Sequence, residues 1–240
     1  MKQKVQCQDL GLISYEKAWD YQRSLMQQLM DIKLQNRTLG AEQKPLIAQQ
    51  HFLLLCEHQH VYTLGKTGSM EHLLLSEKEL AAKKIEFFKI NRGGDITYHG
   101  PGQIVAYPIF DLDCFFTDLH KYVRFLEDII IRTLADYGIE GDRVEGFTGV
   151  WIVPKDGSPK RKICAIGVHM SRWITMHGFA FNVNNDLQYF DYIVPCGIQD
   201  DDKTLTSLSK ELGYSPDIEE VKNKIKIHFA QLFDCSIMVL

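Results

Sequence analysis

Seven short runs of strand-forming residues occupy the middle of the 240-residue sequence, and helical patterns lie before, between and after them. The runs are rich in Val, Ile, Leu, Tyr and Phe and are separated by turn-forming residues, as expected for strands. They cover residues 51–56, 61–64, 85–90, 103–112, 150–153, 162–169 and 174–183. Because the strands cluster instead of alternating regularly with helices, the order predicts an α+β (α/β) fold with a mixed central sheet flanked by helices.

Three segments carry apolar residues at the three- and four-residue spacing of an amphipathic helix. The first follows Ser14, which we expect to be its N-cap. The second follows a predicted cap at Thr117 and ends at Gly138, since glycine is favoured just beyond a helix. The third is predicted to open at Ser215-Pro216.

These elements predict one catalytic domain over residues 1–240, without internal repeats. We expect its core at about 50–212, an N-terminal helix at about 15–35 and a helical tail at about 213–235. The acidic stretch 200–202 is predicted to be a solvated link to that tail.

The composition narrows the class of function. Hydrophobic residues make up 45% and charged residues 24% of the chain, which is typical of a globular domain. The formal net charge of −4 argues against a nucleic-acid partner, which would require a basic face. It leaves open the docking of an acidic carrier protein through a local basic patch.

No targeting or membrane segment is evident. The first 17 residues lack the apolar run of a signal peptide, and no stretch approaches the roughly 18 apolar residues of a membrane span. The six cysteines are scattered, no two form a CxxC pair, and no His/Cys/Asp cluster has zinc-ligand spacing. We therefore predict a cytoplasmic protein with reduced thiols, no membrane contact, no metal and no cofactor.

Residues 92–103, RGGDITYHGPGQ, hold four glycines and one proline, so the segment is not expected inside a regular element. Glycine permits positive φ and close approach of the backbone to a ligand. Arg92, Thr97, Tyr98 and His99 add several hydrogen-bond donors within the same segment. A tight hairpin connection is the alternative interpretation. A nucleotide loop is weakly supported, because neither the P-loop nor the dinucleotide glycine pattern is present.

Two further segments carry candidate reactive groups. On a strand, residues two apart share a face, so Lys162 and Cys164 should point the same way. Cys196 lies between Pro195 and Gly197, which places its thiol on a turn where it can face a cleft. A lone cysteine is often only a buried, inert thiol, and a lysine on a strand is often an edge residue. The positions of these lysine and cysteine residues therefore do not by themselves establish a catalytic role.

Taken together and in this order, the segments RGGDITYHGPGQ, KICAIG, HGFAFNVN and PCGI closely resemble the signature blocks of the lipoyl(octanoyl) transferase family. The resemblance extends over about residues 57–212. It implies the fold of biotin and lipoate protein ligases. It also implies transfer of an octanoyl (or lipoyl) group from acyl carrier protein to a lysine of lipoyl domains, in 2-oxoacid dehydrogenases and the glycine cleavage H protein.

The resemblance also implies roles for individual residues. Cys196 matches the acyl-thioester nucleophile, and Lys162 matches the lysine that forms a dyad with it. Cys164 stays a competing candidate on strand geometry. The residues matching the blocks that line the acyl pocket are Arg92, Gly93, Gly94, Asp95, Ile96, Thr97, Tyr98, His99, Ala165, Ile166, Gly167, Gly178, Phe179 and Ala180. Among them, Tyr98, Phe179 and Ala180 are the predicted walls of the acyl slot.

Three other functions compete with this interpretation. An ATP-dependent lipoate or biotin ligase would need a nucleotide site and would not require Cys196 and Lys162. A non-catalytic protein that binds acyl groups or lipoyl domains would tolerate loss of Cys196. A thioesterase would pass the acyl group to water instead of a lipoyl domain.

Overall fold

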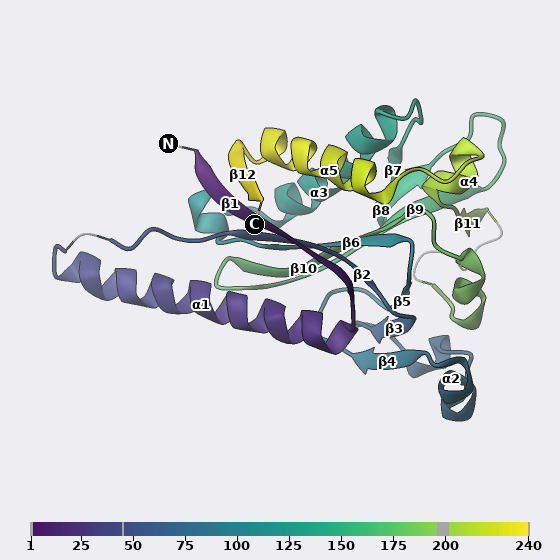
Figure 1. Cartoon of the computed structure of the whole chain (residues 1–240), viewed down its shortest axis with the longest axis horizontal. Helices are drawn as coiled ribbons and strands as arrows, with labels where there is room; N and C mark the ends of the chain where they lie inside the picture. Colours follow the sequence, from purple (N-terminus) through teal and green to yellow (C-terminus); the bar gives the residue numbers. More distant parts are fainter. Residues whose placement is uncertain (1, 45, 196–201, 240) are drawn as a thin grey trace.

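A large mixed β-sheet with helices on both faces dominates the computed structural model, which describes residues 2–44, 46–195 and 202–239 (Figure 1). Its strands are β1 (Gln3–Ile13), β2 (Phe52–His58), β6 (Gln103–Ile109), β7 (Asp142–Val144), β8 (Phe147–Ile152), β9 (Lys160–Ser171), β10 (Ile174–Asn182), β11 (Lys203–Leu205) and β12 (Cys235–Val239). Across the described residues the order is β12-β1-β2-β6-β10-β9-β8-β7, and β11 pairs with β9. β1 is parallel to both of its neighbours, whereas β2, β6, β10, β9 and β8 run antiparallel in turn. The predicted mixed sheet is therefore confirmed.

The helices cover the two faces of this sheet (Figure 1). They are α1 (Tyr15–Ala41), α3 (Leu119–Ala135), α4 (Leu208–Leu212) and α5 (Ile218–Leu232). α2 (Glu77–Lys83) packs instead on β4 (Glu86–Lys89), outside this sheet, and short 3-10 turns lie at Met70–His72, Leu112–Cys114 and Leu187–Tyr192. α1 packs on β6 and β10 and buries Ala18, Leu25 and Leu29. α3 and α5 lie on the opposite face, where Leu126 and Phe229 belong to the larger apolar core. Burying one stripe of each helix against the sheet removes apolar area from water, at roughly 25 cal/mol per Å².

A smaller sheet stands beside the large one and consists of β4 (Glu86–Lys89), β3 (Val61–Leu64) and β5 (Ile96–His99), in that order. β5 corrects the expectation that the glycine-rich segment contains no regular element. The four residues Ile96–His99 include no glycine and pair antiparallel with β3. Because β5 pairs with β3 and not with β6, the turn after His99 connects the two sheets. The hairpin interpretation of this segment is wrong.

Some predicted boundaries shift by a few residues. α1 begins after Ser14 as expected, but the N-cap of α3 is Asp118 instead of Thr117, since Asp118 Oδ1 accepts the N–H of Lys121 at 3.0 Å. α5 begins only at Ile218 after an Asp217 cap. Strands β1 and β12 escaped prediction because β1 mixes polar and apolar residues with a glycine at position 11, and β12 is a five-residue strand at the edge of the sheet. No helix in the described ranges is long and apolar enough to cross a membrane.

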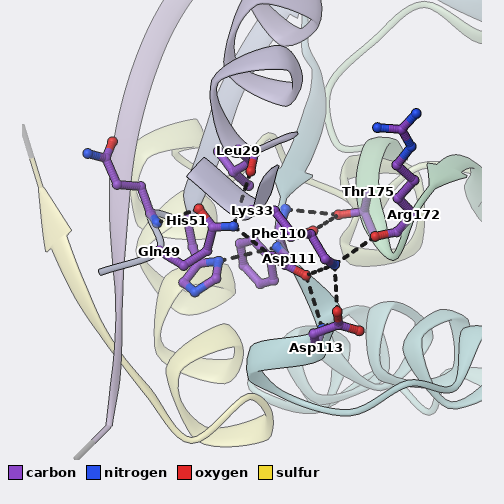
Figure 2. Close-up of polar contacts among 10 residues, drawn as sticks. Leu29, Lys33, Gln49, His51, Phe110, Asp111, Asp113, Arg172 and Thr175 are labelled. Carbon is purple, nitrogen blue, oxygen red and sulfur yellow. Dashed lines mark hydrogen bonds and ion pairs between the residues drawn. The ribbon is translucent and has the colours of Figure 1, made fainter. Parts of the chain in front are cut away.

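A buried ion-pair network fixes the end of the sheet at which β10 begins (Figure 2). The ammonium of Lys33 on α1 donates to Asp111 Oδ1 at 2.8 Å, to Asp113 Oδ2 at 2.6 Å and to the carbonyl oxygen of Arg172 at 2.8 Å. Gln49 Nε2 donates to the other carboxylate oxygen of Asp111 at 2.8 Å. Since Arg172 lies in the β9–β10 turn, the network ties α1 to the start of the strand that carries residues 177–180.

Candidate active site

A cavity of about 500 Å³ lies where the glycine-rich segment, β9 and β10 meet. This volume is within the range of small-molecule sites. The cavity brings together the predicted site residues Arg92, Gly93, Gly94, Asp95, Ile96, Thr97, His99, Lys162, Ala165, Ile166, Gly167, Gly178, Phe179 and Ala180. Segments some 70 residues apart in the sequence thus form a single wall.

Two predicted site residues are not part of this described lining. Cys196 lies outside the described residues, but Pro195, which directly precedes it, lines the cavity. Tyr98 is fully buried elsewhere: its hydroxyl bonds His60 Nδ1 at 2.8 Å, and its ring stacks on Tyr189 at 5.1 Å. Tyr98 therefore supports the small sheet, and its prediction as a wall of the acyl slot is corrected.

Backbone hydrogen bonds hold the glycine-rich loop against the edge of β9. Gly93 N–H donates to the carbonyl oxygen of Val168 at 2.9 Å, and Lys66 N–H donates to that of Arg92 at 3.0 Å. A Cβ on Gly65 would lie 2.2 Å from the carbonyl oxygen of Gly94, so only glycine permits this approach. The loop is a fixed wall of the cavity.

Arg92 presents a buried guanidinium to the cavity. Its Nη2 donates to the carbonyl oxygen of Thr63 at 2.7 Å and to the Thr63 hydroxyl at 3.0 Å, and Nη1 donates to the carbonyl oxygen of Gly93 at 3.0 Å. These bonds fix the orientation of a permanently charged group at the cavity wall.

Lys162 lies on β9 with only 8% of its surface exposed. Its Nζ stands 5.2 Å from the ring centroid of Trp151, in cation–π geometry. A Cβ on Gly149 would lie 2.9 Å from Lys162 Cε and 2.5 Å from the carbonyl oxygen of Cys164. Gly149, with φ of +127°, therefore leaves the space in which the lysine lies. Sequence reasoning missed this glycine, because its neighbour is known only after β8 and β9 pair.

Cys164 lines the same cavity as Lys162, as their spacing on one strand predicts. Burial raises the pKa of its thiol well above the usual range, more than the nearby Lys162 charge lowers it. The sulfur lies 3.6 Å from the carbonyl oxygen of Ala165, toward which its proton points. At neutral pH Cys164 is therefore a protonated thiol and a poor nucleophile.

Aromatic and imidazole rings form the inner wall of the cavity, namely Tyr15, His99, Tyr107 and His177. Burial lowers the pKa of His177 to about 3 and that of His99 well below its usual value, so both rings are neutral near pH 7. Tyr15 stacks on His99 with ring centroids 6.0 Å apart. Nothing in the sequence marks Tyr15 or Tyr107 as site residues, since they reach the cavity only through packing.

His177 has a left-handed backbone conformation, with φ of +61°. Its N–H donates to Gln22 Oε1 at 3.0 Å, and its ring Nε2 bonds Asn91 Oδ1 at 2.9 Å. A non-glycine residue in this region costs on the order of 1–3 kcal/mol, and such strain clusters at functional sites. The bonds from Gln22 and Asn91 offset that cost and fix the ring in the cavity wall.

Comparison of the whole chain with known proteins shows the family to which it belongs. Residues 14–230 match the Lipoyl protein ligase A/B catalytic domain. The octanoyltransferase of Flavobacterium psychrophilum is 58% identical over 240 residues, covering 99% of this chain and 100% of that protein. The octanoyltransferase of Christiangramia forsetii is 54% identical, covering 99% of each chain. The chain belongs to the octanoyltransferase family. It is therefore an acyltransferase of protein lipoylation.

Solved structures show the fold that this octanoyltransferase family member shares with ligases. A lipoate protein ligase of Thermoplasma acidophilum superposes with a TM-score of 0.69 at 14% identity, covering 99% of this chain and 88% of that one. Lipoate-protein ligase A bound with ATP gives a TM-score of 0.67 at 13% identity, covering 100% and 90%. At these identities the likeness shows the fold alone and not an ATP-dependent reaction.

The outer rim of the cavity comes from α3 and the start of β8. Val123, Arg124, Phe147 and Thr148 line it, and Arg124 and Thr148 are exposed. The buried inner wall and the exposed rim thus give the octanoyltransferase cavity a closed end and an open end. Within the described ranges, no group of three or more His, Cys, Asp or Glu side chains is arranged to hold a metal ion.

Proposed function

We propose that this chain transfers an octanoyl group from octanoyl acyl carrier protein to a lysine of a lipoyl domain, through a thioester on Cys196 and with Lys162 as its partner. The observation that carries the proposal is that buried Lys162 and Pro195, the residue before Cys196, line one cavity with apolar residues and neutral histidines. Lipoyl domains of 2-oxoacid dehydrogenases and the glycine cleavage H protein are the proposed acceptors.

The first half-reaction exchanges one thioester for another. A cationic Lys162 favours the thiolate of Cys196, which is the nucleophilic form of cysteine. The thiolate attacks the thioester carbonyl carbon, the carbon–sulfur bond to the carrier's pantetheine breaks, and the leaving thiolate takes a proton from Lys162, which becomes neutral. Because a thioester forms as another is consumed, the step needs no ATP.

The second half-reaction forms an amide. The amine of the acceptor lysine attacks the octanoyl carbonyl, the bond to Cys196 breaks, and the amine loses a proton. Lys162 in its neutral form accepts that proton in this scheme. Backbone N–H groups of the glycine-rich loop are the proposed donors to the oxyanion.

The inner part of the cavity is the proposed acyl slot. Phe179 and Ala180 lie in its lining together with Val105 and Tyr107. Burying six methylenes at about 0.8 kcal/mol each contributes roughly 5 kcal/mol to octanoyl binding. Because His99 and His177 are neutral near pH 7, they place no charge beside the bound octanoyl group.

The chemistry requires a reduced nucleophile, so we propose that the protein works in the cytoplasm. The described cysteines, Cys7, Cys56, Cys114, Cys164 and Cys235, are all free thiols. Free thiols of this kind persist in a reducing compartment.

The test is the intact mass of the protein after mixing with octanoyl acyl carrier protein without ATP. Wild type, Cys196→Ser and Cys164→Ser are compared, and each is then given apo lipoyl domain. We expect an octanoyl adduct in wild type and Cys164→Ser, lost in Cys196→Ser and discharged onto the lipoyl domain. Transfer that occurs only with ATP and free octanoate would overturn the proposal in favour of a ligase. An adduct discharged only to water would indicate a thioesterase.

A further inference from the structure

Two parts of the active site are held by one segment that does not line the cavity. This segment, residues 65–74, contacts the glycine-rich loop at one end and the chain just before Cys196 at the other. We call it the clamp segment. At its first end, Gly65 N–H donates to the carbonyl oxygen of Asp95 at 3.3 Å, and Thr67 N–H donates to that of Gly94 at 3.4 Å.

At its second end, the clamp segment pairs with residues 192–194. Val194 N–H donates to the carbonyl oxygen of His72 at 2.8 Å, and Leu74 N–H donates to that of Tyr192 at 3.0 Å. Leu73 and Ile193 form an antiparallel bridge between these bonds. The backbone that leads to Pro195 at the cavity is therefore fixed by the clamp segment.

His72 joins the two ends. Its backbone carbonyl holds Val194, while its ring Nδ1 bonds Asp95 Oδ2 in the glycine-rich loop. The other carboxylate oxygen, Asp95 Oδ1, accepts the N–H of Ile96 at 2.7 Å. A Cβ on Gly68 would lie 2.5 Å from Asp95 Oδ1, so the carboxylate is packed against glycine as well as bonded.

Asp95 thus uses both oxygens within the protein, although the family resemblance counts it among the pocket residues. A carboxylate bonded in this way orients its neighbours. His72 itself is not among the described residues that line the cavity. Its ring and its backbone together form a two-bond path from the glycine-rich loop to the chain that leads into Cys196.

We propose that His72 is a positioning residue of the transferase, which through Asp95 and Val194 fixes the glycine-rich loop relative to the chain that leads to Cys196. The inference rests on the proposed role of Cys196. Errors of about 1 Å in the placement of reacting groups can cost on the order of 10²-fold in rate. Loss of the His72 ring should therefore slow acylation of the protein without emptying the acyl slot.

The experiment measures single-turnover acylation by octanoyl acyl carrier protein in wild type, His72→Ala and His72→Asn. We expect the rate constant of His72→Ala to fall by about 10- to 10²-fold. The dissociation constant of octanoate, which cannot acylate a thiol, should stay unchanged. Asparagine places an amide nitrogen near the position of Nδ1, so His72→Asn should restore most of the rate. Glu71→Gln, at the neighbouring exposed position, is the matched control and should behave as wild type.

A double variant separates positioning from folding. Asp95→Asn slows acylation on its own, and combining it with His72→Asp exchanges donor and acceptor and should recover part of the rate. An unchanged acylation rate in folded His72→Ala overturns the inference, as does a parallel weakening of octanoate binding that accounts for the whole loss. If wild type forms no adduct at Cys196, the proposed function itself has failed.

Discussion

Lys33 and Lys162 are two largely buried lysines whose surroundings differ. The Lys33 ammonium faces two carboxylates and a carbonyl oxygen in a closed network, with 14% of its side chain exposed (Figure 2). Burial lowers the pKa of Lys33, but hydrogen bonds to Asp111 and Asp113 more than offset this, so the pKa lies above its usual value. Lys162 instead lies over Trp151 and lines the cavity.

The difference shows how one side chain serves two purposes. At Lys33 the cost of removing a charge from water is offset by fixed opposite charges, so the group contributes order to the fold. Lys162 lines the cavity in which we propose that substrate and nucleophile meet, and in that proposal its charge contributes reactivity. Stability should depend on the first lysine and catalysis on the second.

Replacement of Lys162 tests the catalytic side of the comparison. We expect Lys162→Met to lower octanoyl transfer by about 10²- to 10⁴-fold, the usual contribution of an acid–base group. The urea midpoint should stay near that of wild type, because methionine keeps the apolar stem over Trp151. Lys162→Arg keeps the charge but cannot give up its proton and should be nearly as inactive. Wild-type transfer by either variant would contradict the assigned role.

Replacement of Lys33 tests the structural side. Lys33→Met leaves Asp111 buried without its cation, so the free energy of unfolding should fall by roughly 3–5 kcal/mol, while the folded fraction keeps its transfer rate. Urea denaturation and the rate per folded molecule measure the two effects. Lys155→Met is the control, because Lys155 pairs with Glu140 on the surface at 2.9 Å. Its loss should cost less than about 1 kcal/mol.

Gly149→Ala probes the space around Lys162. The added Cβ would meet Lys162 Cε and the backbone of Cys164, so we expect a loss of about 1–3 kcal/mol in stability and roughly 10²-fold in transfer. Gly138→Ala is the matched control, since Gly138 also has positive φ, +74°, but nothing within 4 Å of the added atom. If both variants lose only stability, displacement of Lys162 is not the cause.

The last prediction concerns how the stability of the Lys33 network depends on pH, and it uses His51, which bonds to Asp111. Burial lowers its pKa to about 4, and its neutral Nδ1 accepts the N–H of Asp111 at 3.3 Å. Because the unfolded residue titrates near pH 6.5, the unfolded state binds more protons between those values, and stability falls as pH drops from about 6.5 to 4. His51→Gln should remove roughly 2–3 kcal/mol of that acid sensitivity. Urea midpoints at pH 7 and pH 4.5 measure it, with exposed His120→Gln as the unchanged control.

Much of the fold and site followed from local sequence. The apolar periodicities around Leu25, Leu126 and Phe229 predicted the three main helices, because each helix buries one stripe of side chains. The alternating and apolar runs predicted β2, β3, β6, β9 and β10. The glycine-rich segment and the HGFAFNVN run supplied 13 of the 32 residues in the described cavity lining, and their glycines permit close backbone approach.

Tertiary structure decided what depends on pairing between distant segments. β1, which mixes polar and apolar residues, and the short β12 are strands because their backbones pair with each other at one edge of the sheet. Tyr98 turned away from the cavity because β5 pairs with β3, and Tyr15 entered it because α1 begins beside His99. The sequence shows lysine at positions 33 and 162 alike, whereas carboxylates brought in from residues 111 and 113 make the first structural. Residue chemistry is local, but burial and partners come from long-range packing.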